Sequence, residues 1–301
     1  MSTNSKRSLS LIAIAAGCTL ILQLLNGCKP NDKAFSGELA YKHVEALVNF
    51  GPREPGSQSI IKAQNYIEKE LNEFGWKIFR QSFSDQTPQG EKDFVNLRAR
   101  FSSGDNDIDW KDGGGKILVC SHYDTKIMES INFLGANDGG SSTGILIELG
   151  RVLSKNPNRA SRIELVFFDG EEAVVDFTAV DGLYGSRHYA KYWRSAPQEK
   201  KPVAAYVLDL VGDKNMRIDP PIDSPPHLLS QLYKASRQIG KKSLFGIHPT
   251  PITDDHVPLN AAGIPAIDII DSAYISGGKW HQEGDNMDRS EERRVGKECE
   301  R

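Results

Sequence analysis

Phe167-Phe168-Asp169-Gly170-Glu171-Glu172 joins an apolar segment to three carboxylates. The residues before Asp169, back to Arg162, are mostly apolar, which is typical of a strand buried inside a sheet. Two adjacent glutamates at such a strand end are costly to bury unless a cation neutralises them or they share a proton. A divalent metal meets this cost if Glu172 or Glu171 binds it and the other acts as general base. A solvated acidic turn is the alternative interpretation.

Apolar segments and helical patterns alternate through the second half of the chain. The expected strands are Lys116–Cys120, Ile163–Phe168, Val203–Leu210 and Ala266–Ile270. Between them, apolar residues recur at helical spacing around Ile145 and Leu149, in Tyr184–Trp193 and in Leu228–Ile239. This alternation predicts a largely parallel sheet that is covered by helices on both faces.

The first half of the chain adds two helices and two strands to this sheet. Glu38–Phe50 has helical periodicity and ends at Gly51-Pro52, and a second helix runs from about Ile60 to a stop at Gly75. Trp76–Phe83 and Phe94–Phe101 then read as an antiparallel hairpin at the sheet edge. We therefore expect one α/β domain over residues 35–288, with a central, mostly parallel twisted sheet.

Metal-binding and acid–base side chains follow several of the expected strands. His122 follows the first parallel strand, Glu171 and Glu172 the second, and Asp209 ends the third. Asp138 precedes a helix, and His281 follows the last strand in a Gly-rich loop. A lone histidine is usually structural, but the carboxyl ends of parallel strands meet at one edge of a sheet. These side chains are therefore expected to share one site.

The N-terminal residues read as an export signal. Lys6 and Arg7 precede an apolar run, and Leu25-Asn26-Gly27-Cys28 resembles a bacterial lipobox, with the segment around Cys18 a weaker second candidate. We expect residues 1–27 to be a lipoprotein signal peptide and residues 28–34 a tether that starts at a lipidated Cys28. A membrane anchor helix is the alternative. Both interpretations place the domain outside the cytoplasm, and the first attaches it to a membrane of the bacterial cell envelope.

The charge balance, the C-terminal residues and the cysteines each add a prediction about partners, the end of the domain and disulfides. Lys plus Arg total 37 against 40 for Asp plus Glu, which argues against a nucleic-acid partner. Residues 289–301 lack apolar periodicity and resemble a translated sequencing adapter, so we expect a non-native tail there, with a genuine charged tail as the alternative. Cys120 is the cysteine left to the mature domain, for which we expect no intramolecular disulfide and a monomer.

Several stretches resemble the zinc aminopeptidase superfamily and, more narrowly, the animal-type glutaminyl cyclases. The broader likeness rests on Ser121-His122-Tyr123-Asp124, on Asn137-Asp138 and on Phe168–Ala173. The narrower likeness rests mainly on Asp254-Asp255-His256-Val257-Pro258 and on Trp280-His281. It extends from about Phe35 to Asp288.

The resemblance to the cyclases implies a residue for each role. A single zinc would be held by Asp138, Glu172 and His281, and Glu171 would be the general acid and base. Asp209 and Asp254 would form a hydrogen-bonded acidic pair that steers the proton and the substrate amine. Trp280 would wall the substrate pocket, together with Phe177, which stands where animal cyclases have tryptophan and so lacks the indole donor.

The implied reaction is cyclisation of N-terminal glutamine in peptides or proteins to pyroglutamate, with release of ammonia. A di-zinc aminopeptidase is the first alternative, because His122 and Asp209 could hold a second zinc with Asp138 as the bridge. One zinc per chain is expected for the cyclase and two for the aminopeptidase. A catalytically inactive binding module of the cell envelope is the second alternative, and the intact Glu171 argues against it.

Overall fold

The computed structural model describes residues 34–102 and 108–287. The predicted signal peptide, Cys28 and the predicted tail over 289–301 lie outside these residues, so the predictions made for them remain predictions. Among the described residues, no helix combines the length and the apolar character needed to cross a bilayer.

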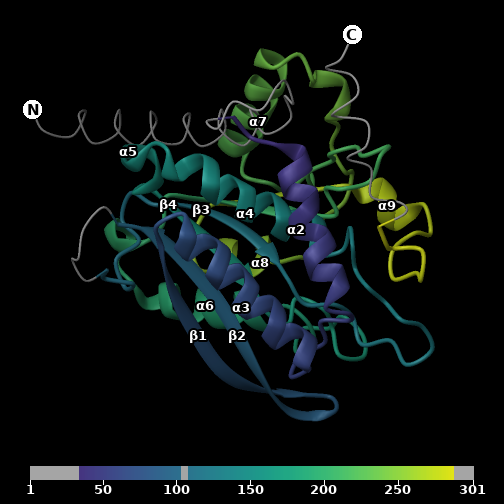
Figure 1. The fold of residues 1–301 in the computed structure, drawn as a ribbon. Coiled ribbons are helices and arrows are strands. Elements are labelled where there is room, and N and C mark those ends of the chain that lie inside the picture. Colours follow the sequence, from purple (N-terminus) through teal and green to yellow (C-terminus); the bar gives the residue numbers. More distant parts are fainter. Residues whose placement is uncertain (1–33, 103–107, 288–301) are drawn as a thin grey trace, which may run out of the picture.

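A six-stranded sheet forms the centre of the structure, in the order β1-β2-β4-β3-β5-β6 (Figure 1). The last four strands in this order run parallel to one another. They are β4 (Ile163–Phe168), β3 (Ile117–His122), β5 (Ala204–Asp209) and β6 (Ala266–Ile270). The hairpin of β1 (Trp76–Thr87) and β2 (Gly90–Phe101) adds to β4 in antiparallel orientation. The predicted fold class, with its mostly parallel sheet and edge hairpin, is confirmed.

Both faces of the parallel strands are buried, which explains their continuous apolar sequences. Alternate residues of β3 belong to different core clusters: Ile117 and Val119 pack on one side, and Leu118 and Cys120 on the other. The first face is covered by α3 (Gln58–Glu73), α4 (Gly140–Ser154) and α7 (Pro226–Gln238). The second face is covered by α6 (Tyr184–Ser195) and α8 (His256–Ala261) (Figure 1).

The first two helices of the described residues begin at serine caps. Ser36 accepts from Leu39 N at the start of α2 (Gly37–Asn49), and Ser57 accepts from Ile60 N at the start of α3. Helix α2 packs against α4 rather than against the sheet, as Figure 1 shows. This arrangement brings Arg53, in the turn between α2 and α3, into the buried region below the ends of the strands.

The hairpin is longer than the sequence predicts. Its pairing extends to Thr87 opposite Gly90, beyond the predicted ends at Phe83 and Phe94. The extension is polar and largely exposed, and Ser84 donates to Asp93 across the strands at 2.6 Å. Apolar alternation is therefore absent in this part, because neither face meets a core.

Short elements complete the fold, and they carry too few residues to give a periodic signal. They are α5 (Pro157–Ala160), η1 (Gln198–Lys200), η2 (Lys242–Leu244) and α9 (Ser272–Ser276). Helix α8, also short, begins immediately after Asp254-Asp255 and places these acids beside the ends of the parallel strands.

Candidate metal and acid–base site

The functional side chains gather at the carboxyl ends of the parallel strands. His122 is the last residue of β3, Asp209 is the last residue of β5, and Glu171 and Glu172 follow β4. Asp138 stands just before α4. In its left-handed backbone conformation, His281 returns to the same place from the loop after α9, as its contacts show.

Asp138 belongs to two groups of ligand-type atoms. The first group is Asp138, Glu172 and His281, and the second is His122, Asp138 and Asp209, with all atoms of a group within 4.8 Å of one another. His281 Nε2 lies 3.0 Å from Glu172 Oε2 and 3.6 Å from Asp138 Oδ2. His122 Nε2 lies 3.2 Å from both Asp138 Oδ1 and Asp209 Oδ1. The structure thus brings together every residue that the sequence proposed as a ligand.

The residues of the first group fit a divalent cation. Asp138 Oδ2 and Glu172 Oε2 are buried and, although both face His281 Nε2, neither accepts a hydrogen bond, which is unusual for polar atoms inside a protein. Burial, reinforced by the negative charge of Asp138, raises the pKa of Glu172 to about 7. Carboxylate oxygens and imidazole nitrogens both bind zinc, and three protein ligands with one further position open are typical of catalytic zinc.

Glu171 has the environment of an acid–base group. Its side chain is buried, and burial raises its pKa well above the ordinary value, with Glu172 adding to the shift. A carboxyl group with a raised pKa is suited to general acid–base catalysis. The positive charge of His122 acts in the opposite direction but does not cancel the shift.

Asp124 orients both glutamates, although the sequence suggested no role for it. One of its carboxylate oxygens accepts from Glu171 N and the other from Glu172 N, each at 3.2 Å. Oδ1 also lies 3.3 Å from His122 Nδ1, so the same side chain orients the imidazole. The available signal was its position two residues beyond His122, at the same strand end.

Asp285 and Arg53 hold the loop that carries Asp138. The Asp285 carboxylate accepts from Asn137 N at 2.6 Å and from Asp138 N at 3.0 Å. The guanidinium of Arg53 is fully buried and donates to the backbone oxygens of Tyr123, Leu134 and Gly135. Sequence reasoning missed both roles, because their partners are backbone groups far along the chain.

The predicted hydrogen bond between Asp209 and Asp254 is absent among the described residues, although the charge of Asp209 acts on Asp254. Asp209 Oδ1 lies 3.2 Å from His122 Nε2 and accepts from Leu210 N at 2.8 Å, whereas Asp254 Oδ1 accepts from Asp255 N and Asp254 Oδ2 makes no hydrogen bond. Burial, and next the charge of Asp209, raise the pKa of Asp254 to about 7. Burial and the charge of Asp254 also raise the pKa of Asp268, a third acid that lies within the apolar strand β6 and that the sequence pattern did not single out.

Aromatic rings line up beside His281. The rings of Trp280 and His281 are stacked at 3.8 Å, and Phe177 is stacked on Trp280 at 6.4 Å. The ring of Phe133 lies edge-on to that of His281, with the two centroids 5.6 Å apart. Phe177 and Trp280, which are predicted to wall the substrate pocket, thus lie against each other, and Phe133 is an addition beside His281; the pocket-lining role itself stays a prediction.

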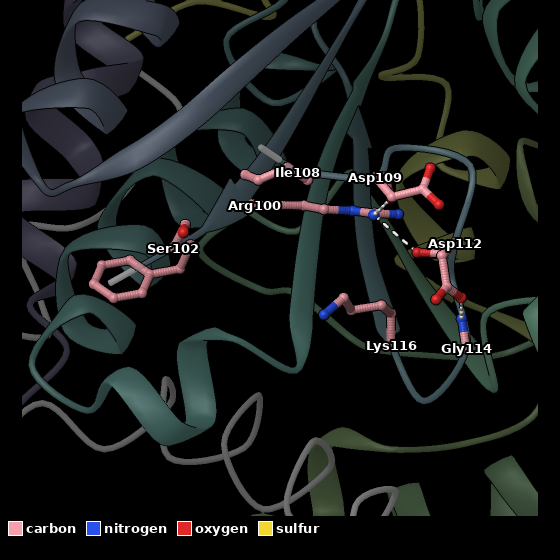
Figure 2. Close-up of a pocket in the computed structure, with 8 residues that line it drawn as sticks. Arg100, Ser102, Ile108, Asp109, Asp112, Gly114 and Lys116 are labelled. Atoms are coloured by element: carbon pink, nitrogen blue, oxygen red, sulfur yellow. Dashed lines mark hydrogen bonds between the residues drawn. The ribbon is translucent and has the colours of Figure 1, made fainter. Parts of the chain in front are cut away.

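A hollow of about 250 Å³ lies at the other end of the sheet and does not belong to this site (Figure 2). Lys116, which precedes β3, lines it, whereas the site lies beyond the last residue of that strand. Figure 2 shows Arg100 directed at the backbone oxygens of Asp109 and Asp112, which it binds at 2.7 and 2.9 Å. The guanidinium of Arg100 is also paired with the buried Glu164, so the polar groups of this hollow serve to hold the fold together.

The sequence matches the profile of peptidase family M28 over residues 107–299. A glutaminyl-peptide cyclotransferase of Dictyostelium discoideum is 30% identical over 263 residues, which are 75% of this chain and 72% of that protein. A glutaminyl-peptide cyclotransferase-like protein of Bos taurus is 27% identical over 262 residues, 78% of this chain and 66% of the relative. The chain thus spans about two thirds of the length of these relatives.

Solved structures show the same architecture. A glutaminyl cyclase from an Acidobacteriales bacterium superposes with a TM-score of 0.78 at 33% identity, over 90% of this chain and 93% of that one. A Zn-dependent exopeptidase from Parabacteroides distasonis gives a TM-score of 0.73 at 26% identity, over 88% and 95%. The chain therefore belongs to peptidase family M28, alongside relatives that are named as glutaminyl-peptide cyclotransferases.

Proposed function

We propose that this protein is a zinc-dependent glutaminyl cyclase, which converts N-terminal glutamine of peptides or proteins to pyroglutamate. The observation that carries the proposal is the buried Glu171, whose pKa is raised by burial and whose backbone is held by Asp124 next to the ligand group. The names of the relatives in Dictyostelium and in the Acidobacteriales bacterium support the same reaction.

The reaction joins two atoms of one residue. The α-nitrogen attacks the γ-carbonyl carbon, the bond from that carbon to the amide nitrogen breaks, and ammonia leaves. One proton must therefore move from the α-amine, whose ordinary pKa is about 8, to the departing nitrogen. No water enters the balance, so the protein has to fold the glutamine side chain back on itself and exclude solvent.

Glu171 carries this proton in the proposed mechanism. As a carboxylate it accepts the proton from the α-amine, and as a carboxylic acid it returns the proton to the leaving nitrogen. Asp254 and Asp209 hold the amine by hydrogen bonds, and Phe177 and Trp280 pack against the apolar part of the glutamine. The raised pKa of Glu171 suits both halves of the transfer.

The resident metal of this mechanism is zinc. Asp138, Glu172 and His281 would hold it, and when bound it supplies a Lewis acid for the γ-carbonyl oxygen. The unpartnered oxygens of Asp138 and Glu172 support this assignment. We propose one zinc per chain for the cyclase.

A di-zinc aminopeptidase is the second candidate function. The group of His122, Asp138 and Asp209 favours it, since its ligand-type atoms lie within the same 4.8 Å as those of the first group and all three residues are buried. The discriminating experiment combines zinc analysis with two substrates, Gln-β-naphthylamide and Leu-p-nitroanilide. Ammonia release from the first with one zinc per chain is expected. Release of nitroaniline with two zincs would replace the cyclase by the peptidase.

We also propose that the protein is a lipoprotein of the bacterial cell envelope, anchored through Cys28. The lipobox-like Leu25-Asn26-Gly27-Cys28 after an apolar run supports this attachment. In the native host, Cys28→Ala should move the protein from the membrane to the soluble fraction, because the acyl chains are the proposed attachment. A variant that stays in the membrane with its signal uncleaved would favour an anchor helix instead.

A further inference from the structure

The segment from Lys279 to Asp285 carries His281 without the support of a helix or strand. It follows α9 and Gly278, and His281 itself has a φ of 53°. A residue with a Cβ avoids this left-handed conformation unless its surroundings impose it. The geometry of this proposed zinc ligand must therefore be set by contacts at the two ends of the segment.

The C-terminal end of the segment is attached to the Asp138 loop. The Asp285 carboxylate binds Asn137 N and Asp138 N, and Ala136 N donates to Asp285 O at 3.4 Å. The loop that carries Asp138 is thus tied to the C-terminal end of the segment that carries His281.

The N-terminal end is attached by an ion pair. Lys279 Nζ lies 2.8 Å from Asp213 Oδ2, and it also lies over the ring of Tyr274 at 5.6 Å. The Asp213 side chain is only 4% exposed, and its other oxygen accepts from Asn215 N at 2.7 Å. Because the carboxylate is buried and oriented, it offers Lys279 one defined position.

Asp213 belongs to the framework that also carries Asp138. Gly212 N donates to Asn137 Oδ1 at 2.7 Å, and Val211 N donates to Ser141 Oγ at 3.2 Å. A Cβ on Gly212 would come within 2.7 Å of the Ser141 side chain, so the two loops are in close contact. The ion pair therefore connects His281 to the same rigid base as Asp138.

We propose that Lys279 and Asp213 are a positioning pair that sets the place of His281 relative to Asp138 and Glu172, and thereby the affinity for zinc. With Asp285 at the other end, the pair fixes the segment at two points, and Trp280 lies between them. The inference rests on the proposed zinc function. It assigns Lys279 and Asp213 no contact with substrate.

The test measures zinc affinity directly, by chelator competition on the full chain, together with Trp280 stacking by fluorescence. Lys279→Met should weaken zinc binding about tenfold, the lower end of what outer partners of metal ligands contribute. The kcat at saturating zinc should stay near wild type, since the catalytic groups are unchanged. The difference from wild type should shrink at high salt, because the lysine is 35% exposed.

Charge exchange and a neighbouring lysine provide the controls. The double variant Lys279→Asp with Asp213→Lys should regain part of the affinity that each single change loses. Lys214→Met removes an exposed positive charge next to Asp213 without touching the pair, and it should leave zinc affinity unchanged. Equal zinc affinity of wild type and Lys279→Met would overturn the inference. A wild type that binds no zinc would instead overturn the proposed function.

Discussion

Asp138 is the residue on which both candidate metal positions depend. Its Oδ1 faces His122 and its Oδ2 faces His281, so a change of Asp138 alters both groups at once. Burial raises the pKa of this carboxyl, but the hydrogen bond and charge of His122 outweigh burial and leave it below the ordinary value. A carboxylate that lies between two imidazoles and whose ionised form is favoured is suited to bind one cation or to bridge two.

Glu171→Gln tests the acid–base role. The amide has nearly the same shape but cannot carry a proton at neutral pH, so kcat should fall on the order of 100-fold or more while zinc stays bound. The measurements are kcat on Gln-β-naphthylamide and metal content after gel filtration. A variant with the kcat of wild type would remove Glu171 from the mechanism.

His122→Ala separates the one-zinc from the two-zinc site. If His122 only hydrogen-bonds Asp209 and Asp138, the variant should retain its single zinc and lose roughly 10- to 100-fold in cyclisation. If it is a ligand, half of the metal and the activity should disappear together.

His281→Ala is the matched control, since both alternatives make His281 a ligand. It should lose zinc in either case. Two zincs in wild type and one zinc without activity in His122→Ala would make the cyclase assignment wrong.

At the scale of elements, the loop over 173–182 is held by Lys126, which lies outside it, and by its own Asp181. Lys126 Nζ donates to the backbone oxygens of Ala173 and Val175, and the Asp181 carboxylate accepts from the backbone N–H groups of 174–176 at 2.7 to 3.1 Å. These contacts hold the backbone of this irregular loop in one conformation. They also fix Phe177 in its place against Trp280.

Lys126→Met should therefore affect substrate binding more than chemistry. Without the ammonium, the loop loses its contacts to Ala173 O and Val175 O, and Phe177 stacks less well on Trp280. KM for an N-terminal glutamine substrate should rise several-fold, while kcat changes less than twofold. Steady-state kinetics measures both values.

Lys126→Arg, which keeps the donors, should recover part of the KM, and Lys191→Met on the exposed face of α6 should behave as wild type. A fall in kcat with an unchanged KM would contradict this role of the loop.

At the scale of the whole molecule, the buried His43 links stability to pH. His43 of α2 is bonded to Tyr66 OH at 2.7 Å, and burial, with the charge of Arg151, lowers its pKa from 6.5 to about 4. The fold thus prefers the neutral imidazole. The stability that depends on a neutral His43 is fully present above pH 6.5 and is lost as the pH falls towards 4. The loss of unfolding free energy in that window amounts to about 2 to 3 kcal/mol.

His43→Gln should accordingly flatten the pH dependence of unfolding. The measurement is the free energy of unfolding in urea at pH 7 and at pH 4.5, for wild type and variant. Wild type should lose about 2 to 3 kcal/mol more than the variant over this range. The exposed His227 of α7 offers the control His227→Gln. An equal pH dependence of wild type and His43→Gln would show that His43 does not titrate on unfolding.

Local patterns were enough to predict the parallel strands, the main helices and the ligand-type residues. The strands from Ile163 and from Ala266 have the predicted bounds, because a strand buried on both faces is apolar throughout. A carboxylate or histidine at the end of such a strand stands out against it, which is how Glu172 and Asp209 were found. These signals depend on spacing over a few residues, so they need no knowledge of contacts between distant segments.

The tertiary structure alone decided how these parts combine. Glu172 and His281 are 109 positions apart, and their contact depends on the strand order and on the left-handed turn at His281. The supporting roles of Asp124 and Asp285 were not predictable, because their partners are backbone N–H groups that every residue except proline possesses. Spacing along the chain can therefore identify candidate ligands, whereas their orientation follows only from the folded backbone.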